Sequence, residues 1–112
     1  MTDIRKLTEE YVAAFDARDL DRIAGYFSDG FKLTDPDVIA LTPKANVLTY
    51  LKELFDSHDT LNFKSRSILV DGDSSVIHFT LKLDTMTLDG VDVISWKSGK
   101  MICMEAYLTK RK

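Results

Sequence analysis

Three polar side chains stand in stretches of this 112-residue chain that are otherwise apolar, and together they could move a proton. Tyr11 falls on the apolar stripe of a predicted helix, and Asp35 immediately precedes a proline. Asp92 shares a strand face with Ile94 and Trp96, because side chains two residues apart in a strand point the same way. A carboxylate base, with a buried phenol and a second carboxyl group as donors to an oxyanion, would suit proton abstraction next to a carbonyl group.

The residues that other chemistries require are scarce. Cys103 is the only cysteine, which excludes an intrachain disulfide and a thiolate zinc site. The two histidines lie outside any metal-binding motif: His58 is expected at a helix C-terminus and His78 on the outer face of a sheet. The five glycines form neither a dinucleotide-binding fingerprint nor a phosphate loop. We therefore expect neither a metal ion nor a cofactor.

Length and charge narrow the class of protein further. A chain of 112 residues is expected to form one domain, 1–112. The net charge of −3 has the wrong sign for a nucleic-acid or anionic-membrane surface, and the short basic end, Lys110–Lys112, is expected to be a solvated tail. The longest uncharged stretch, Ser74–Leu81, is too short for a bilayer span, and the charged start does not resemble a signal peptide. We expect a cytoplasmic protein with no nucleic-acid or membrane partner.

The first half of the chain has the apolar spacing of helices, which must position Tyr11. A first helix is predicted over residues 3–17, and a short second one begins after Asp19 as its N-cap. A brief extended piece, 31–34, then leads to Asp35, because a proline keeps the residue before it out of the α region. A third helix is predicted from Thr42 as cap, with proline at its first position, to about His58.

The second half changes to the period-two pattern of strands. The dipeptides at 71–72, 89–90 and 98–99 are hairpin signals of the Asp-Gly or Ser-Gly type. They predict an antiparallel meander of four strands, Leu61–Val70, Ser75–Met86, Leu88–Lys97 and Lys100–Leu108. Helices followed by strands indicate an α+β fold, with the helices packed on one face of a curved sheet.

The alternation in the last predicted strand also indicates a partner. It places Met101, Cys103 and Tyr107 on the face that points away from the helices. An apolar patch on that face would be exposed in a monomer, and a two-fold axis would let each patch cover its copy. We therefore expect a homodimer formed through the outer face of the sheet.

Two groups of residues, one towards each end of the chain, form a recognisable combination, namely Tyr11–Asp21, Phe27, Asp29 and Asp35 with Pro36, and Asp92–Trp96, Ser98–Ile102 and Ala106. With these residues the chain resembles the ketosteroid isomerases and, more broadly, the polyketide-cyclase-like (SnoaL-like) members of the nuclear transport factor 2-like superfamily. The resemblance covers nearly the whole chain. It implies a cone-shaped fold, in which a strongly curved antiparallel sheet wraps around three N-terminal helices and leaves an apolar cavity open at one end.

The resemblance also implies roles for individual residues. Asp35 falls on the catalytic base, and Tyr11 on the tyrosine of the oxyanion hole. Asp92 falls on a carboxylic acid that ketosteroid isomerase itself keeps protonated in an apolar site as the second oxyanion donor. The substrate, a small apolar molecule, would lie against Phe15, Phe27, Phe55, Phe79, Leu81, Ile94, Trp96, Met104 and Ala106. The implied activity is that of a cofactor-free isomerase or cyclase.

The depth of Asp92 depends on where the preceding hairpin turns. If the turn is at Asp89 and Gly90, Asp92 lies near the rim of the cavity, where solvent keeps it ionised. If the chain turns near Asp84–Met86 instead, Asp89 and Gly90 form a bulge and Asp92 can lie deep. The sequence leaves both arrangements open.

The same three residues also have purely structural interpretations. A tyrosine on an apolar stripe is often a core residue, an aspartate before proline is often a turn residue, and Asp92 could be an ordinary hairpin aspartate. Two functional hypotheses therefore stand. Either Asp35 moves a proton while Tyr11 and Asp92 stabilise the enolate, or the protein is a non-catalytic ligand-binding or dimerisation module.

Overall fold

The helical and extended halves that the periodicity predicts are both present in a computed structural model, which describes residues 2–111. One strand, β1, lies between the second and third helices. The elements are α1 (Ile4–Asp16), α2 (Leu20–Tyr26), β1 (Phe27–Thr34), α3 (Lys44–Asp56), β2 (Leu61–Asp71), β3 (Ser74–Leu83), β4 (Met86–Lys97) and β5 (Lys100–Lys110).

Side-chain caps explain where the first two helices begin. Asp3 and Asp19 each accept a hydrogen bond from a backbone N–H three residues further on, which satisfies a donor that the first helical turn leaves free. The predicted cap Asp19 is thereby confirmed. The predicted start of α3 is wrong by one residue, because Pro43 itself occupies the N-cap. The hydroxyl of Thr42 donates instead to the carbonyl of Gly30 in β1, 3.2 Å away.

The five strands form one sheet in the order β1-β5-β4-β3-β2. The predicted antiparallel meander of β2 to β5 is confirmed. The sheet as a whole is mixed, however, because β1 pairs with β5 in parallel, with Leu33 opposite Met104. The sequence predicted the extended piece but not its partner, since a parallel pair carries no hairpin signal and β5 is the last strand of the chain.

The hairpin between β3 and β4 turns at Asp84. Of the two turns that the sequence allowed, the one near Asp84–Met86 is therefore correct, and the one at Asp89 and Gly90 is not. The predicted bulge is absent, since Asp89 and Gly90 continue an unbroken ladder opposite β3. A Cβ at Gly90 would lie 2.3 Å from the backbone oxygen of Tyr107, so glycine permits the close approach of β5 there. Asp92 consequently lies well inside the sheet, between β3 and β5.

A bulge in β5 reverses one predicted face. Ser95 pairs with Cys103 and Trp96 pairs with Met101, so Ile102 is the extra residue. Met101 is therefore completely buried, whereas Ile102 is 41% exposed. The prediction that Met101 belongs to the outer face is wrong, because the bulge shifts the alternation by one residue.

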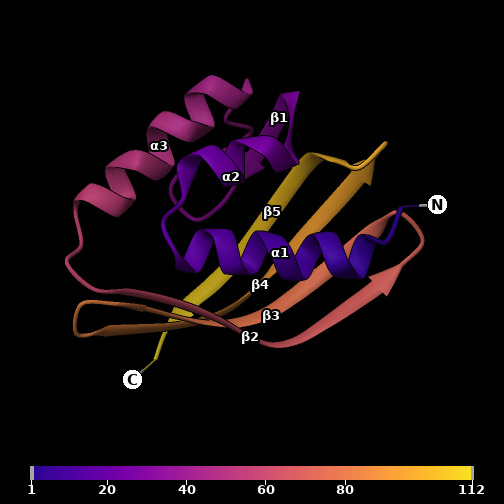
Figure 1. Ribbon diagram of the computed structural model, residues 1–112. Helices are drawn as coiled ribbons and strands as arrows, with labels where there is room; N and C mark the ends of the chain where they lie inside the picture. Colours follow the sequence, from indigo (N-terminus) through magenta and orange to yellow (C-terminus); the bar gives the residue numbers. More distant parts are fainter. Residues whose placement is uncertain (1, 112) are drawn as a thin grey trace.

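The three helices lie on one side of the curved sheet, as Figure 1 shows, and the core fills the space between the two layers. α1 packs across β2 and β3, and α3 packs against β1. Register shifts in β2 and between β4 and β5 add bends to the strands. The predicted α+β cone is thereby confirmed, with a mixed sheet in place of a fully antiparallel one.

Lys110 and Arg111 are both exposed to solvent, as expected for the basic end. The guanidinium of Arg111 also donates two hydrogen bonds to Asp89, at 2.9 and 2.7 Å. Met1 and Lys112 lie outside the described residues. None of the helices within residues 2–111 has the length and apolar character needed to cross a membrane.

Candidate functional site

A cavity of about 290 Å³ lies between the helices and the concave face of the sheet. Most of its wall is aliphatic or aromatic. The exceptions are two tyrosines, three aspartates and a histidine, namely Tyr11, Tyr50, Asp35, Asp37, Asp92 and His58. Among the described residues, no lysine or arginine lines it. A small, mostly apolar pocket with a few polar groups is typical of a site for a small organic ligand.

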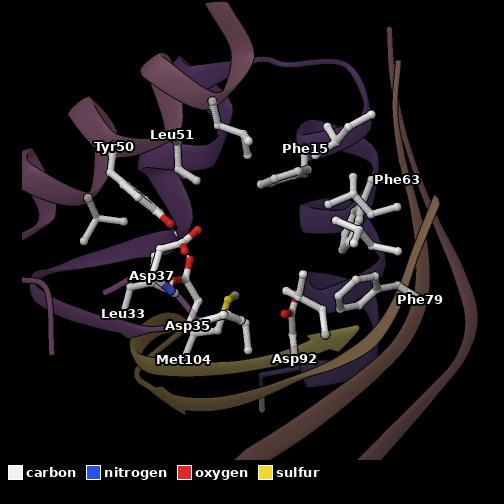
Figure 2. A pocket seen from close by; sticks show the side chains of 18 of the residues that line it. Phe15, Leu33, Asp35, Asp37, Tyr50, Leu51, Phe63, Phe79, Asp92 and Met104 are labelled. Atoms are coloured by element: carbon white, nitrogen blue, oxygen red, sulfur yellow. Dashed lines mark hydrogen bonds between the residues drawn. The ribbon is translucent and has the colours of Figure 1, made fainter. Parts of the chain in front are cut away.

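The three predicted catalytic residues all lie at the wall of this cavity, although they come from different elements. Tyr11 is on α1, Asp35 follows β1, and Asp92 is on β4. Figure 2 shows the carboxyl groups of Asp35 and Asp92 on opposite sides of one open space, with Met104 between them. The fold therefore brings together groups that the sequence keeps far apart.

Asp92 lies deep in the sheet and is only 6% exposed. Its carboxyl group accepts no hydrogen bond from any residue in the range 2–111, and Figure 2 shows it directed into the cavity. Burial, and secondarily the negative charge of Asp35, raise the pKa of Asp92 to about 7. Near neutral pH a large fraction of Asp92 is therefore a carboxylic acid, which can donate a hydrogen bond.

Tyr11 is buried against the rings of Phe15 and Phe27, with centroids 6.1 and 6.3 Å away. Within residues 2–111, every fully buried side-chain nitrogen or oxygen atom has a hydrogen-bond partner. Since the Tyr11 hydroxyl has no protein partner there, it must be accessible from the cavity. Burial, with a smaller contribution from the charge of Asp92, raises the pKa of Tyr11 well above its ordinary value, so the hydroxyl remains a donor.

Asp35 is held by three hydrogen bonds. Its Oδ1 accepts the backbone N–H groups of Asp37 and Val38, at 2.8 and 3.0 Å, which is the pattern of an Asx turn. Its Oδ2 accepts the hydroxyl of Tyr50 at 2.7 Å, the contact drawn as a dashed line in Figure 2. No lysine, arginine or histidine within residues 2–111 forms an ion pair with Asp35.

Six of the nine predicted ligand-contacting residues line the cavity, namely Phe15, Phe27, Phe79, Leu81, Met104 and Ala106. Phe55 does not, because it packs behind Phe15 with ring centroids 5.2 Å apart. Ile94 and Trp96 do not either, because the cavity reaches along β4 only as far as Asp92. The indole N–H of Trp96 instead donates to the hydroxyl of Ser75 in the sealed core.

Sequence reasoning missed three polar groups at the wall, Asp37, Tyr50 and His58. Tyr50 is half-buried on α3 beside the apolar stripe of that helix, and no local pattern connects it with Asp35. His58 follows α3, and its Nδ1–H donates to the carbonyl of Leu54 at 2.9 Å, which agrees with the expected place at a helix C-terminus. No cluster of three metal-binding side chains occurs within the described part of the chain.

Several solved structures share this fold with little sequence identity. A SnoaL-like protein of unknown function from Burkholderia thailandensis is 21% identical, with a TM-score of 0.80, and the match covers 100% of this chain and 99% of that one. A putative ketosteroid isomerase from Kribbella flavida is 17% identical, with a TM-score of 0.83 and coverage of 97% and 79%. AclR, a putative hydroxylase from Streptomyces galilaeus, is 16% identical, with a TM-score of 0.81 and coverage of 96% and 79%. These likenesses establish the fold alone.

The sequence itself carries the family assignment. Comparison with curated protein sequences gave no match. The family model described as SnoaL-like domain, in contrast, matches residues 8–104, which include Tyr11, Asp35 and Asp92. Because that match spans most of the 112 residues and the fold agrees with it, the chain belongs to the SnoaL-like family.

Proposed function

We propose that the protein catalyses proton transfer next to a carbonyl group of a small apolar molecule, without a cofactor. The observation that carries this proposal is the placement of Asp35, Tyr11 and Asp92 at one apolar cavity. Asp35 has no cationic partner within residues 2–111, and in the same range the side-chain oxygens of Tyr11 and Asp92 have no protein hydrogen-bond partner. A carboxylate and two unused donors facing one space are the groups that such a reaction needs.

In the proposed reaction, Asp35 takes a proton from the carbon next to the carbonyl group. The electron pair of the broken C–H bond forms a carbon–carbon double bond, and the carbonyl oxygen becomes an enolate oxygen. The hydroxyl of Tyr11 and the protonated carboxyl of Asp92 donate hydrogen bonds to that oxygen. Asp35 then returns the proton to the same carbon, which gives exchange, or to another carbon, which gives an isomer.

The test is hydrogen exchange on 2-tetralone, a two-ring ketone with acidic hydrogens beside its carbonyl group. In D₂O, NMR should show protein-dependent loss of those hydrogens. Asp35→Asn keeps the shape of the side chain but removes the base, so the rate should fall at least about 100-fold. Asp29→Asn, the same substitution on a solvent-exposed position of β1, should leave the rate unchanged. Equal rates in the wild type and Asp35→Asn would contradict the proposal.

A non-catalytic ligand-binding module is the second candidate, and one observation favours it. The Asx turn made by Asp35 is itself a sufficient reason for an aspartate before Pro36, because it orders the loop between β1 and α3. Under this alternative 2-tetralone binds in the cavity, while its hydrogens exchange no faster than in buffer. The exchange experiment therefore separates the two candidates.

We also propose that two copies pair through the outer face of the sheet. Tyr107 is 57% exposed and Ile102 is 41% exposed, while Cys103 is partly exposed beside them on β5. These residues form the outer-face patch, in which Ile102 takes the place expected for Met101. An exposed patch of this kind on a small protein is typical of an interface.

A further inference from the structure

The hydrogen bonds around Asp35 leave one place at which it can accept a proton. A carboxylate oxygen has two acceptor positions. Both positions on Oδ1 are occupied by the backbone N–H groups of Asp37 and Val38. Oδ2 accepts one hydrogen bond, from the hydroxyl of Tyr50 at 2.7 Å, so its second position is open.

We propose that Tyr50 is a positioning residue, which fixes the Asp35 carboxylate so that the open acceptor position of Oδ2 faces the cavity. This inference rests on the proposed function, since it presumes that Asp35 is the base. The Asx turn holds Oδ1 against the loop, and the hydroxyl of Tyr50 holds Oδ2 from the opposite element, α3. With both oxygens held, the carboxylate cannot rotate away from a ligand.

Tyr50 can serve this purpose because α3 is itself anchored at its C-terminal end. The guanidinium of Arg18 donates to the carbonyl groups of Phe55, His58 and Asp59, at 2.7 to 2.9 Å. These bonds satisfy carbonyl groups at the helix end and connect it to the end of α1. The hydroxyl of Tyr50 is therefore supported by a fixed helix rather than by a loop.

The loop does not depend on Tyr50 for its shape. The backbone N–H of Asp35 donates to the carbonyl of Val38 at 2.9 Å, and neither this bond nor the two bonds to Oδ1 involve the hydroxyl of Tyr50. Tyr50→Phe is therefore expected to fold as the wild type does, and to lose the positioning of Oδ2 alone.

The first experiment is independent of any activity. The side-chain carboxyl ¹³C signals of the aspartates are followed by NMR from pH 2 to 9, and Asp35→Asn identifies the Asp35 signal. Tyr50→Phe should move the titration of that signal to higher pH, because one hydrogen bond to the charged form is lost. The other ionisable groups at the wall are Tyr11, Asp37, His58 and Asp92, and all of them are retained.

The matched control is Tyr107→Phe, which removes a hydroxyl donated to the Glu105 carboxylate on the outer face of the sheet. It should leave the Asp35 titration unchanged. If Tyr50→Phe also leaves it unchanged, the positioning role is refuted, whatever the outcome of the exchange experiment.

The second experiment uses 2-tetralone exchange. Tyr50→Phe should lower kcat about tenfold with little change in KM, and should move the acidic limb of the pH–rate profile to higher pH. A rise in KM with an unchanged kcat would contradict the positioning role, because it would show that Tyr50 contributes to binding alone. If instead Asp35→Asn exchanges as fast as the wild type, the proposed function fails, and the NMR titration alone decides whether Tyr50 holds Asp35.

Discussion

At the scale of single residues, the charge state of Asp92 makes the stability of the protein depend on pH near neutrality. The pKa of about 7 means that the folded protein holds the Asp92 proton far more tightly than the unfolded chain, whose carboxyl titrates near its ordinary 3.8. Below that value both states are protonated, so this group does not affect stability. As the pH rises toward 7, only the unfolded chain releases the proton, so the free energy of unfolding falls.

Asp92→Asn should abolish this loss. At pH 8 the variant should be more stable than the wild type by on the order of 4 kcal/mol, the equivalent of a shift of about three pKa units. At pH 4 the two proteins should be nearly equally stable, because protonated aspartic acid and asparagine are both neutral. Urea unfolding at the two pH values measures the difference. A stability gap that does not depend on pH would show that Asp92 is not held protonated by burial.

At the scale of elements, the sequence predicted what local patterns encode. The stripe around Tyr11, the cap Asp19 and the meander all follow from spacing and turn residues in neighbouring segments. The failures depend on how strands pair, which no single segment encodes. The bulge at Ile102 is set by how β5 aligns with β4, and the partner of β1 is set by the whole sheet.

The approach of β5 to Gly90 gives a prediction at this scale. Gly90→Ala places a Cβ 2.3 Å from a backbone oxygen and 2.8 Å from the side chain of Leu108, so the strands must separate. The free energy of unfolding should fall by about 3 kcal/mol or more. Gly25→Ala in α2 meets nothing within 4 Å and should raise it by about 0.5 to 1 kcal/mol. Equal effects of the two substitutions in urea unfolding would argue against the close strand approach.

At the scale of the whole molecule, the fold decides which side chains reach the cavity. The alternation of β4 correctly placed Asp92, Ile94 and Trp96 on one face, but it could not show that the cavity ends at Asp92. Likewise, no pattern in the sequence brings Tyr50 to Asp35, because their contact depends on how α3 packs against the end of β1. Candidate residues could be predicted from strand and helix faces, whereas the extent of the site required the packed structure.

The outer-face patch gives a prediction for the assembly. Light scattering at micromolar concentration should give twice the 12.7 kDa mass of one chain. Tyr107→Lys puts a charge into the patch and should shift the mass toward that of a monomer. Ile39→Lys, at a position 88% exposed in the loop between β1 and α3, should leave the mass unchanged. A monomer mass for the wild type would contradict the pairing.

The ionised side chains that line the cavity carry negative charge. Asp35 and Asp37 face no lysine or arginine among the described lining residues, whereas a large fraction of Asp92 is neutral near pH 7. An anion that entered would lose its hydration and meet a field of its own sign, at a cost of about 1 to 4 kcal/mol for each close charge. A neutral ketone or a protonated phenol meets no such barrier, and an amine would be attracted. We therefore expect the cavity to bind neutral molecules in preference to carboxylates and phosphates of the same size.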